Sequence, residues 1–261
     1  IAGLSNRHTE STFINTINNC VNYGEMTSAV PRTSGILAAA NQYTVIESCK
    51  NYGNQTNSAA GTRVGMITCV LGGQCHMRDC ENYGDAIMTG ANAQVGGLVC
   101  LLNDNFVEVT GGGNYGKVIS DIDASPAGYK GTLAANFSKF AKVDNVVAGG
   151  AVGKYNGGEY VMETITEDNY MDYIGKYSSA NAEKITNIIF KGEDVKTPGI
   201  ATAQDLIDFA AAVNSGASIE NWQDAQGTVV LLNDIDMKDV AVWTPIGNGK
   251  FSGSVSGGNQ H

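Results

Sequence analysis

Short apolar segments alternate with polar stretches along most of the chain. The apolar segments are about four to six residues long and rich in Val, Ile and Leu, and Gly, Asn and Ser lie between them. This pattern is typical of short β-strands joined by turns. It predicts an all-β fold.

The predicted strands belong to a repeat that is marked by the string Cys-x-Asn-Tyr-Gly. Three copies occupy residues 20–24, 49–53 and 80–84, and a fourth copy at 112–116 has lost the cysteine. Their final glycines are 29, 31 and 32 residues apart. Each unit contains two short strands, a polar loop and an Asn-Tyr-Gly turn, with no helical period of useful length. Because a unit this small cannot bury its apolar side alone, successive units must stack.

Stacking of such units predicts a right-handed parallel β-helix, which is a solenoid in which each repeat forms one turn. Parallel strands of successive turns lie about 4.8 Å apart, so equivalent side chains form ladders along the solenoid. A β-propeller is the alternative architecture, although its blades are longer, roughly 40–50 residues.

Four positions of the repeat are expected to form structural ladders. The Asn amides can bond to one another and to the turn backbone, and the Tyr rings can stack. The Cys side chains can fill the interior, and the Gly suits a backbone with positive φ. An aromatic platform that binds sugar is the alternative role for the tyrosines. The ladder residues are Cys20, Cys49, Cys80, Asn22, Asn51, Asn82, Asn114, Tyr23, Tyr52, Tyr83, Tyr115, Gly24, Gly53, Gly84 and Gly116.

The C-terminal part of the chain has a different pattern. Thr202 followed by Asp205 predicts the start of a helix, and the Asn-Ser-Gly string at 214–216 predicts its end. A short α-helix near 202–214 would cap the open end of a solenoid. The expected domains are solenoid repeats in 1–153, a connector or inserted subdomain in 154–198, and the capping helix with the first solenoid strands of a module in 199–261.

The repeat pattern of Gly and two apolar residues followed by IxxCxNYGxI resembles the GLUG-type repeats of bacterial surface and secreted proteins. The strings ATAQDLIDFAAAVNSG, TVVLLNDIDMKDVAVWTPIG and FSGSVSGGNQH resemble the opening of the same modules. The family's second glycine is replaced by Ala38, Thr68 and Cys100 in successive units. The resemblance implies a β-helical scaffold that is extracellular or on the bacterial cell surface and mostly non-catalytic.

The two ends of the chain carry strings that follow one another in the resembled modules, where FSGSVSGGNQH runs into IAGLSN. The chain is then one period of a tandem array, a permuted chain, or a subunit whose C-terminal coil is completed by the next subunit's N-terminal strand. A cut at an arbitrary point is the remaining alternative. Strand addition that does not close makes a filament. The residues expected at the self-assembly ends are Ile1, Gly3, Leu4, Phe251, Val255 and His261.

Composition and charge argue against nucleic acid as a partner and against a membrane span. The formal net charge of −10 argues against nucleic acid, and the longest apolar runs are far too short to span a bilayer. Stacking permits a disulfide between Cys69 and Cys100, although buried free thiols are the favoured state of the six cysteines. Zinc at residues 75–80 and calcium at the acids of 121–123 or 234–239 are weaker alternatives. We expect no metal and no cofactor.

The chain lacks the usual signatures of catalysis. His occurs three times, and no nucleophile elbow, phosphate loop or metal-binding His pair is present. We therefore expect a non-catalytic, extracellular structural protein that associates with itself end to end into a surface filament or array. One alternative is an adhesin module that binds a glycan or a host protein. The other is a polysaccharide-degrading β-helix with paired carboxylates, in which the ring of Trp222 or Trp243 would form the floor of the sugar-binding site.

Overall fold

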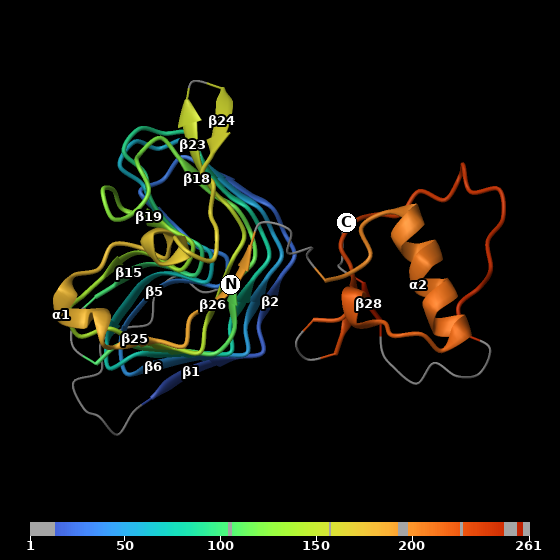
Figure 1. Ribbon diagram of the computed structural model, residues 1–261, viewed down its shortest axis with the longest axis horizontal. Helices are drawn as coiled ribbons and strands as arrows, with labels where there is room; N and C mark the ends of the chain where they lie inside the picture. The colour runs from blue at the N-terminus through green and yellow to red at the C-terminus, as the bar shows by residue number, and fades with distance from the viewer. Residues whose placement is uncertain are drawn as a thin grey trace. The chain divides into compact units, whose positions relative to one another are not determined.

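The computed structural model describes residues 14–103, 106–156, 158–192, 198–224 and 227–247, and the strand at 255–257. The chain folds into two compact units, Ile1–Val195 and Lys196–His261. The first unit is a β-solenoid of about four turns built from stacked parallel sheets (Figure 1). This architecture confirms the predicted fold class.

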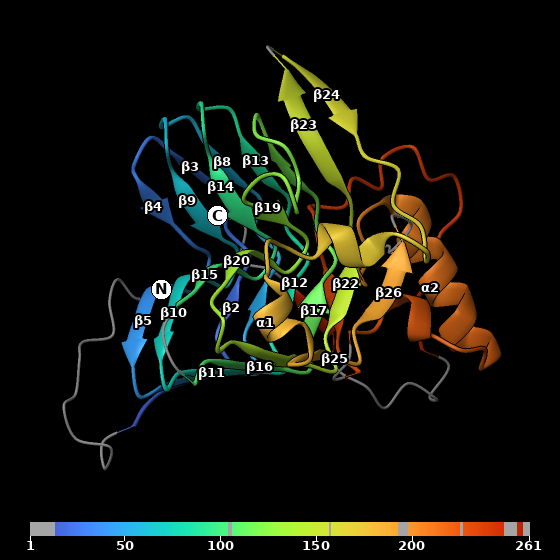
Figure 2. The same ribbon diagram turned by 60° about the vertical axis from the view of Figure 1, so that its left-hand side comes forward.

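The turns of the solenoid contribute successive strands to five sheets (Figure 2). Sheet I contains β1 (Asn15–Asn18), β6 (Thr44–Glu47), β11 (His76–Arg78), β16 (Glu108–Thr110), β21 (Lys142–Asp144) and β25 (Ile185–Thr186). Sheet II contains β2 (Val21–Asn22), β7 (Lys50–Asn51), β12 (Glu81–Asn82), β17 (Gly113–Asn114), β22 (Val147–Gly149) and β26 (Ile189–Gly192).

The other three sheets complete each turn. Sheet III contains β3 (Met26–Ser28), β8 (Gln55–Asn57), β13 (Ala86–Met88), β18 (Val118–Ser120), β23 (Val152–Asn156) and, as an antiparallel hairpin on β23, β24 (Glu159–Met162). Sheet IV contains β4 (Arg32–Thr33), β9 (Arg63–Gly65), β14 (Gln94–Gly96) and β19 (Lys130–Gly131). Sheet V contains β5 (Leu37–Gln42), β10 (Thr68–Gly73), β15 (Val99–Leu102) and β20 (Ala134–Phe137).

The pairing register places equivalent repeat positions above one another. Asn22 pairs with Asn51, Asn51 with Asn82, and Asn82 with Asn114. The chain bends from sheet I into sheet II through one residue in the left-handed region, directly before the Cys position of the repeat. These bend residues are Asn19, Ser48, Asp79, Gly111 and Asn145.

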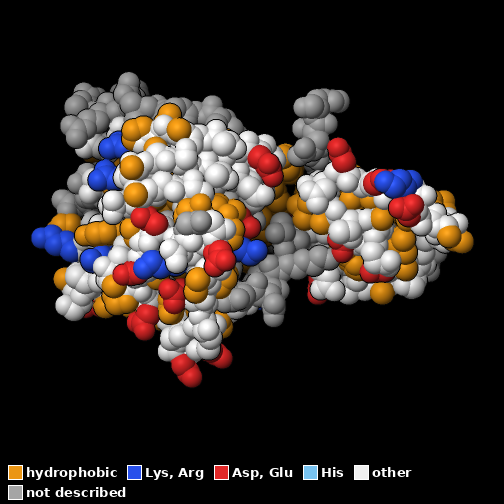
Figure 3. Space-filling view, turned by 90° about the horizontal axis from the view of Figure 1, so that it is seen from above, with side chains coloured by type: hydrophobic (Ala, Val, Ile, Leu, Met, Phe, Trp, Pro, Cys, Tyr) orange, Lys and Arg blue, Asp and Glu red, His pale blue; other side chains and the backbone are white. Residues whose placement is uncertain are grey.

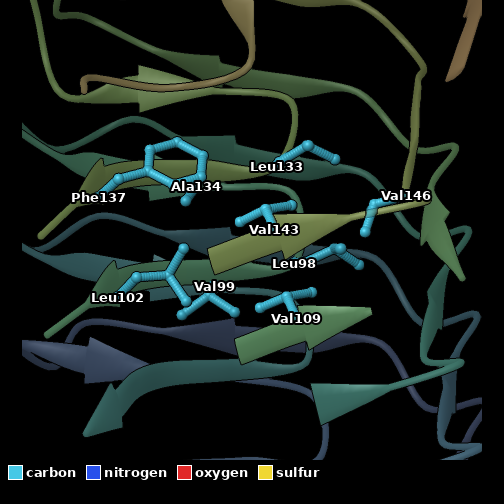
Figure 4. A pocket seen from close by; sticks show the side chains of 9 residues that line it. All are labelled: Leu98, Val99, Leu102, Val109, Leu133, Ala134, Phe137, Val143 and Val146. Atoms are coloured by element: carbon cyan, nitrogen blue, oxygen red, sulfur yellow. The ribbon is translucent and has the colours of Figure 1, made fainter. Parts of the chain in front are cut away.

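The interior of the solenoid is a continuous apolar core. Ile46, Met77, Val109 and Val143 occupy one position of sheet I in successive turns, and each is at most 3 % exposed. A gap of about 10 Å³ remains where sheets I and V face each other (Figure 4). Only apolar side chains line this gap, so it offers a water molecule no polar partner. The lining residues are Leu98, Val99, Leu102, Val109, Leu133, Ala134, Phe137, Val143 and Val146.

The segment after the β23–β24 hairpin covers the end of the last turn. It contains η1 (Tyr170–Tyr173) and α1 (Ser179–Ala182), and the Ile174 side chain between them is fully buried. The Leu133 N–H donates to the Ile174 carbonyl at 3.1 Å, so this segment also bonds to the last turn through its backbone. The described residues from 154 to 192 thus continue the solenoid and belong to the first unit.

The second unit is built around α2 (Ala203–Ser215), and the helix expected near 202–214 is confirmed. The Thr202 Oγ1 accepts from the Asp205 N–H at 3.1 Å, and Gly216 ends the helix with a φ of 74°. The helix buries Phe209 and Val213 against the strand that follows. The remaining elements are η2 (Glu220–Trp222) and the parallel pair of β27 (Val229–Leu231) and β28 (Val255–Gly257).

Candidate functional site

The asparagines of sheet II form a hydrogen-bonded ladder through the first unit. The Nδ2 of Asn22 donates to the Oδ1 of Asn51 at 2.7 Å, and Asn51 donates in the same way to Asn82 at 2.8 Å. Asn82 then donates to Asn114 at 2.7 Å. Each Nδ2 also donates to the carbonyl of the glycine in its own turn. Because every amide donates toward the following turn, the ladder has a direction.

The two ends of this ladder differ chemically. At the last turn the Nδ2 of Asn114 donates to the Gly149 carbonyl at 3.3 Å, so the donor is satisfied where Ala148 replaces the next Asn. At the first turn the Oδ1 of Asn22 accepts from the Gly24 N–H at 3.2 Å, but no described side chain donates to it. The ladder is therefore closed after the fourth turn and open at the first.

The repeat tyrosines form a continuous stack. Ring centroids of successive tyrosines are 5.2, 4.9 and 4.8 Å apart, with interplanar angles of 10°, 11° and 9°. A sugar platform needs free ring faces, but the inner faces of this stack cover one another. Burial raises the pKa of Tyr115 to about 12 and that of Tyr83 further, with a smaller contribution from Glu81. The geometry thus favours the structural role for the tyrosines.

The glycines of the Asn-Tyr-Gly turns do not have the positive φ that the sequence predicts, so that expectation was wrong. A Cβ at Gly53 would overlap with the carbonyl oxygen of Gly24 in the preceding turn. Gly84 and Gly116 have the same relation to the glycine one turn earlier. Glycine is required because successive turns approach so closely. Gly24 has no described turn beneath it, and its Cβ would meet only the Oδ1 of Asn22 at 3.6 Å.

All six cysteines are free thiols. The Sγ atoms of Cys49 and Cys80 donate at 3.6 Å to carbonyls of the preceding turn, those of Ile17 and Ile46. Contact with the thiol of Cys49 and burial raise the pKa of the Cys80 thiol. Cys20, in the first turn, is partly exposed. The cysteines fill the interior as small apolar side chains with weak donors.

The strands of the first turn form an open edge. β1 to β5 are the terminal strands of their sheets, and each pairs on one side only among the described residues. In β3, the Met26 N–H donates to Asn54 at 2.8 Å, and the Ser28 carbonyl accepts from Ser58 at 3.1 Å. Alternate residues of a strand direct their backbone groups to opposite neighbours, so the N–H and C=O of the exposed Thr27 point away from β8.

The structure buries charged groups that the sequence analysis missed. Lys130 is fully buried, and its Nζ donates to three backbone carbonyls at 2.6 to 3.2 Å. Burial lowers the pKa of Lys130 to about 8. In sheet II, Lys50 and Glu81 form a buried ion pair at 3.6 Å. Their opposite charges in successive Cys-x-Asn strings were a signal for this pair, whereas nothing in the sequence marks Lys130. The carbonyl partners of Lys130 are Ser120, Ile122 and Gly153.

Several charged side chains are paired on the surface. Glu108 accepts from Lys142 at 2.6 Å and lies 3.1 Å from the His76 Nδ1. The carboxylate of Asp123 pairs with Lys154 at 2.6 Å. Acidic and basic side chains are interspersed on the face of the first unit in Figure 3. Within the described ranges, no three His, Cys, Asp or Glu side chains are grouped to hold a metal ion, and no helix is long and apolar enough to cross a membrane.

The two tryptophans have different surroundings in the second unit. Trp222 packs edge-on against Phe209 with ring centroids 5.7 Å apart, which is a core contact. Trp243 is 38 % exposed and borders a shallow hollow of about 190 Å³ beside α2. The polar atoms of Asn214 in this hollow bond to the Pro245 carbonyl and the Gly247 N–H. Asn214 therefore links the loop that contains Pro245 and Gly247 to α2 through hydrogen bonds.

No family model fits the chain, and no match was found among curated proteins or solved structures.

The residues expected at the self-assembly ends lie mostly outside the described part of the chain. This holds for Ile1, Gly3, Leu4, Phe251 and His261, while Val255 is the first residue of β28. What the structure provides near these ends is the open edge of the first turn and the two-stranded sheet of the second unit.

Proposed function

We propose that the chain is a non-catalytic structural repeat protein whose copies join end to end into a filament or array outside the bacterial cell. The observation that supports this function best is the open edge of β1 to β5. Unpaired strand edges are templates for further strands, and soluble proteins normally cover or blunt them. Here the last turn is covered by residues 170–176, whereas β2 to β5 of the first turn have a strand partner on one side only within the described ranges, and their other edges face the same way.

The ladders of the first unit support addition of a turn at the same place. The Oδ1 of Asn22 can accept one further donor, and Tyr23 stacks on Tyr52 through one ring face, with no described ring on its other face. Gly24 leaves room for a carbonyl oxygen beneath it. A preceding turn of the same kind would use all three features. The extracellular location and the non-catalytic role rest on the resemblance to GLUG-type repeats.

Negative-stain electron microscopy of the purified full chain, with sedimentation velocity over a range of concentrations, tests this function. We expect filaments or rods with a regular axial repeat, and a sedimentation coefficient that rises with concentration. The variant Gly24→Ala should keep its far-UV circular dichroism but assemble less, because the new methyl group occupies the space of the added turn. Monomeric particles of the unaltered chain at every concentration would contradict the proposal.

A further inference from the structure

The second unit has the construction of the first coil of a solenoid. The Ile200 N–H donates to Val230 at 2.8 Å, and the Leu232 N–H donates to Ile200 at 2.8 Å. These bonds occupy one edge of β27, and β28 occupies the other in parallel register. Helix α2 packs on β27 through Phe209 and Val213. The start of this coil is therefore covered, and the other edge of β28 has no strand partner among the described residues.

The direction of this open edge matches the first turn of the solenoid. In a solenoid each later strand is added on the side away from the start, and in the second unit that side is β28. The first turn lacks a strand on the opposite side, the one that faces an earlier coil. An edge that needs a following strand and an edge that needs a preceding strand are complementary, because parallel pairing preserves the direction of winding.

The sequence pattern indicates which strand of the first turn pairs with β28. In sheet III, β3, β13 and β18 begin with an apolar residue that follows a glycine and a polar residue, and β28 begins in the same way after Gly253 and Ser254. Strands of the other four sheets of the first unit that also begin two residues after a glycine lack this pattern. The middle residue is apolar before β5 and β15, whereas β9 and β19 begin with a basic residue and β17 begins with a glycine. The pattern gives β28 the position of a sheet III strand, so its partner in the first turn is β3.

We propose that β28 of one copy pairs in parallel with β3 of a second copy, so that the second unit of each molecule forms the coil before the first turn of the next. The inference rests on the proposed function and specifies its interface. The outward N–H and C=O of Thr27 are the groups that bond to β28. An edge-strand pair of this kind is strand addition between subunits, and its repetition makes a polar filament.

The length of the connecting segment prevents the second unit from pairing with the first turn of its own molecule. Suppose that the second unit formed the coil before the first turn of its own chain. From Gly192 in β26 there are five strand spacings across sheet II to the first turn, one more to β28, one to β27 and one to Ile200, which makes eight. Eight spacings amount to about 38 Å. Eight residues of fully extended chain span at most about 29 Å. The second unit therefore cannot form the coil before the first turn of its own molecule.

Two full-length variants that each lose one edge provide the test. Thr27→Pro removes the outward N–H of β3 without removing a bond to β8, and Ser256→Pro disrupts β28. The expected result is that each variant alone is monomeric in sedimentation velocity. An equimolar mixture should form a 1:1 dimer that does not grow, since β28 of the Thr27→Pro chain can still pair with β3 of the Ser256→Pro chain. Thr27→Ala and Ser256→Ala, which keep the N–H groups, are matched controls that should assemble like the unaltered chain.

A second pair of variants distinguishes loss of edge pairing from local misfolding caused by proline. Thr27→Lys and Ser256→Lys place a charge on each edge strand, which opposes edge pairing without removing an N–H group, and they should give the same monomers and the same mixed dimer. If the unaltered chain assembles and the Thr27 and Ser256 variants do so equally well, the β3–β28 interface is wrong while end-to-end assembly stands. A mixture of variants that stays monomeric also overturns the interface. If the unaltered chain stays monomeric at every concentration, the proposed function itself fails.

Discussion

Replacing Asn82 by alanine removes the centre of the asparagine ladder. Asn82 is fully buried, and its amide makes four hydrogen bonds. It donates to Asn114 at 2.7 Å and to the Gly84 carbonyl at 2.8 Å. It accepts from Asn51 at 2.8 Å and from the Gly84 N–H at 3.2 Å. The substitution Asn82→Ala leaves these partners in a site that water does not reach.

The expected loss of stability follows from these four bonds. A typical intramolecular hydrogen bond contributes about 1 kcal/mol net, and a buried group left without its partner costs about 1–3 kcal/mol. We therefore expect Asn82→Ala to lower the free energy of unfolding of the solenoid by about 3–5 kcal/mol. Urea unfolding followed by far-UV circular dichroism measures this change. Trp222 and Trp243 are the only tryptophans, so their fluorescence reports the second unit alone and should be unaffected.

The first residue of the ladder is the matched control. In the monomer Asn22 makes the same kinds of bond, but they lie at the exposed end, where water replaces a lost partner. We expect Asn22→Ala to cost only about 1 kcal/mol. Equal losses for Asn22→Ala and Asn82→Ala would refute the argument, because burial of the ladder would then have no effect on its strength. A loss below about 1 kcal/mol for Asn82→Ala would do the same.

Three further predictions concern the first unit. Gly84→Ala forces a Cβ into the carbonyl of the preceding turn and should destabilise the solenoid by about 1–3 kcal/mol or more, whereas Gly24→Ala should be neutral in the same urea titration. Lys130→Met leaves three buried carbonyls without a donor and should cost about 3 kcal/mol or more, so an unchanged melting temperature would contradict the role of the ammonium group. Burial raises the pKa values of Tyr83 and Tyr115, so the unfolded chain loses these protons first and stability should fall as the pH rises above about 10. A phenolate absorbance titration in which all tyrosines ionise together near pH 10 would contradict this last prediction.

The repeat was sufficient to predict the solenoid and its ladders, because stacking in register follows from the nearly equal spacing of the Cys-x-Asn-Tyr-Gly strings. The amide bonds from Asn22 to Asn114 depend on local geometry that recurs in every turn, and recurrence is visible in a sequence. The helix of the second unit was also predictable, since the Thr202 and Asp205 cap is a local signal.

The features that the sequence did not reveal depend on contacts between distant residues. The acceptors of the buried Lys130 lie in two separate segments of the chain, at Ser120 and Ile122 and at Gly153, and no local pattern brings them together. The turn glycines were misinterpreted for a similar reason. A glycine in a turn suggests a positive φ, whereas the constraint at Gly53 comes from the carbonyl of Gly24, 29 residues earlier.

The direction of the asparagine ladder explains why the two ends of the solenoid are not equivalent. Each amide donates to the following turn, so a ladder that stops must leave a donor at its last turn and an acceptor at its first. The chain satisfies the donor of Asn114 with the Gly149 carbonyl, and the segment around Ile174 covers the same end. A carbonyl oxygen such as that of Asn22 has two lone pairs and tolerates partial exposure to water at little cost, whereas a buried donor does not. The end with the free acceptor is therefore the one that can remain open and still receive another turn.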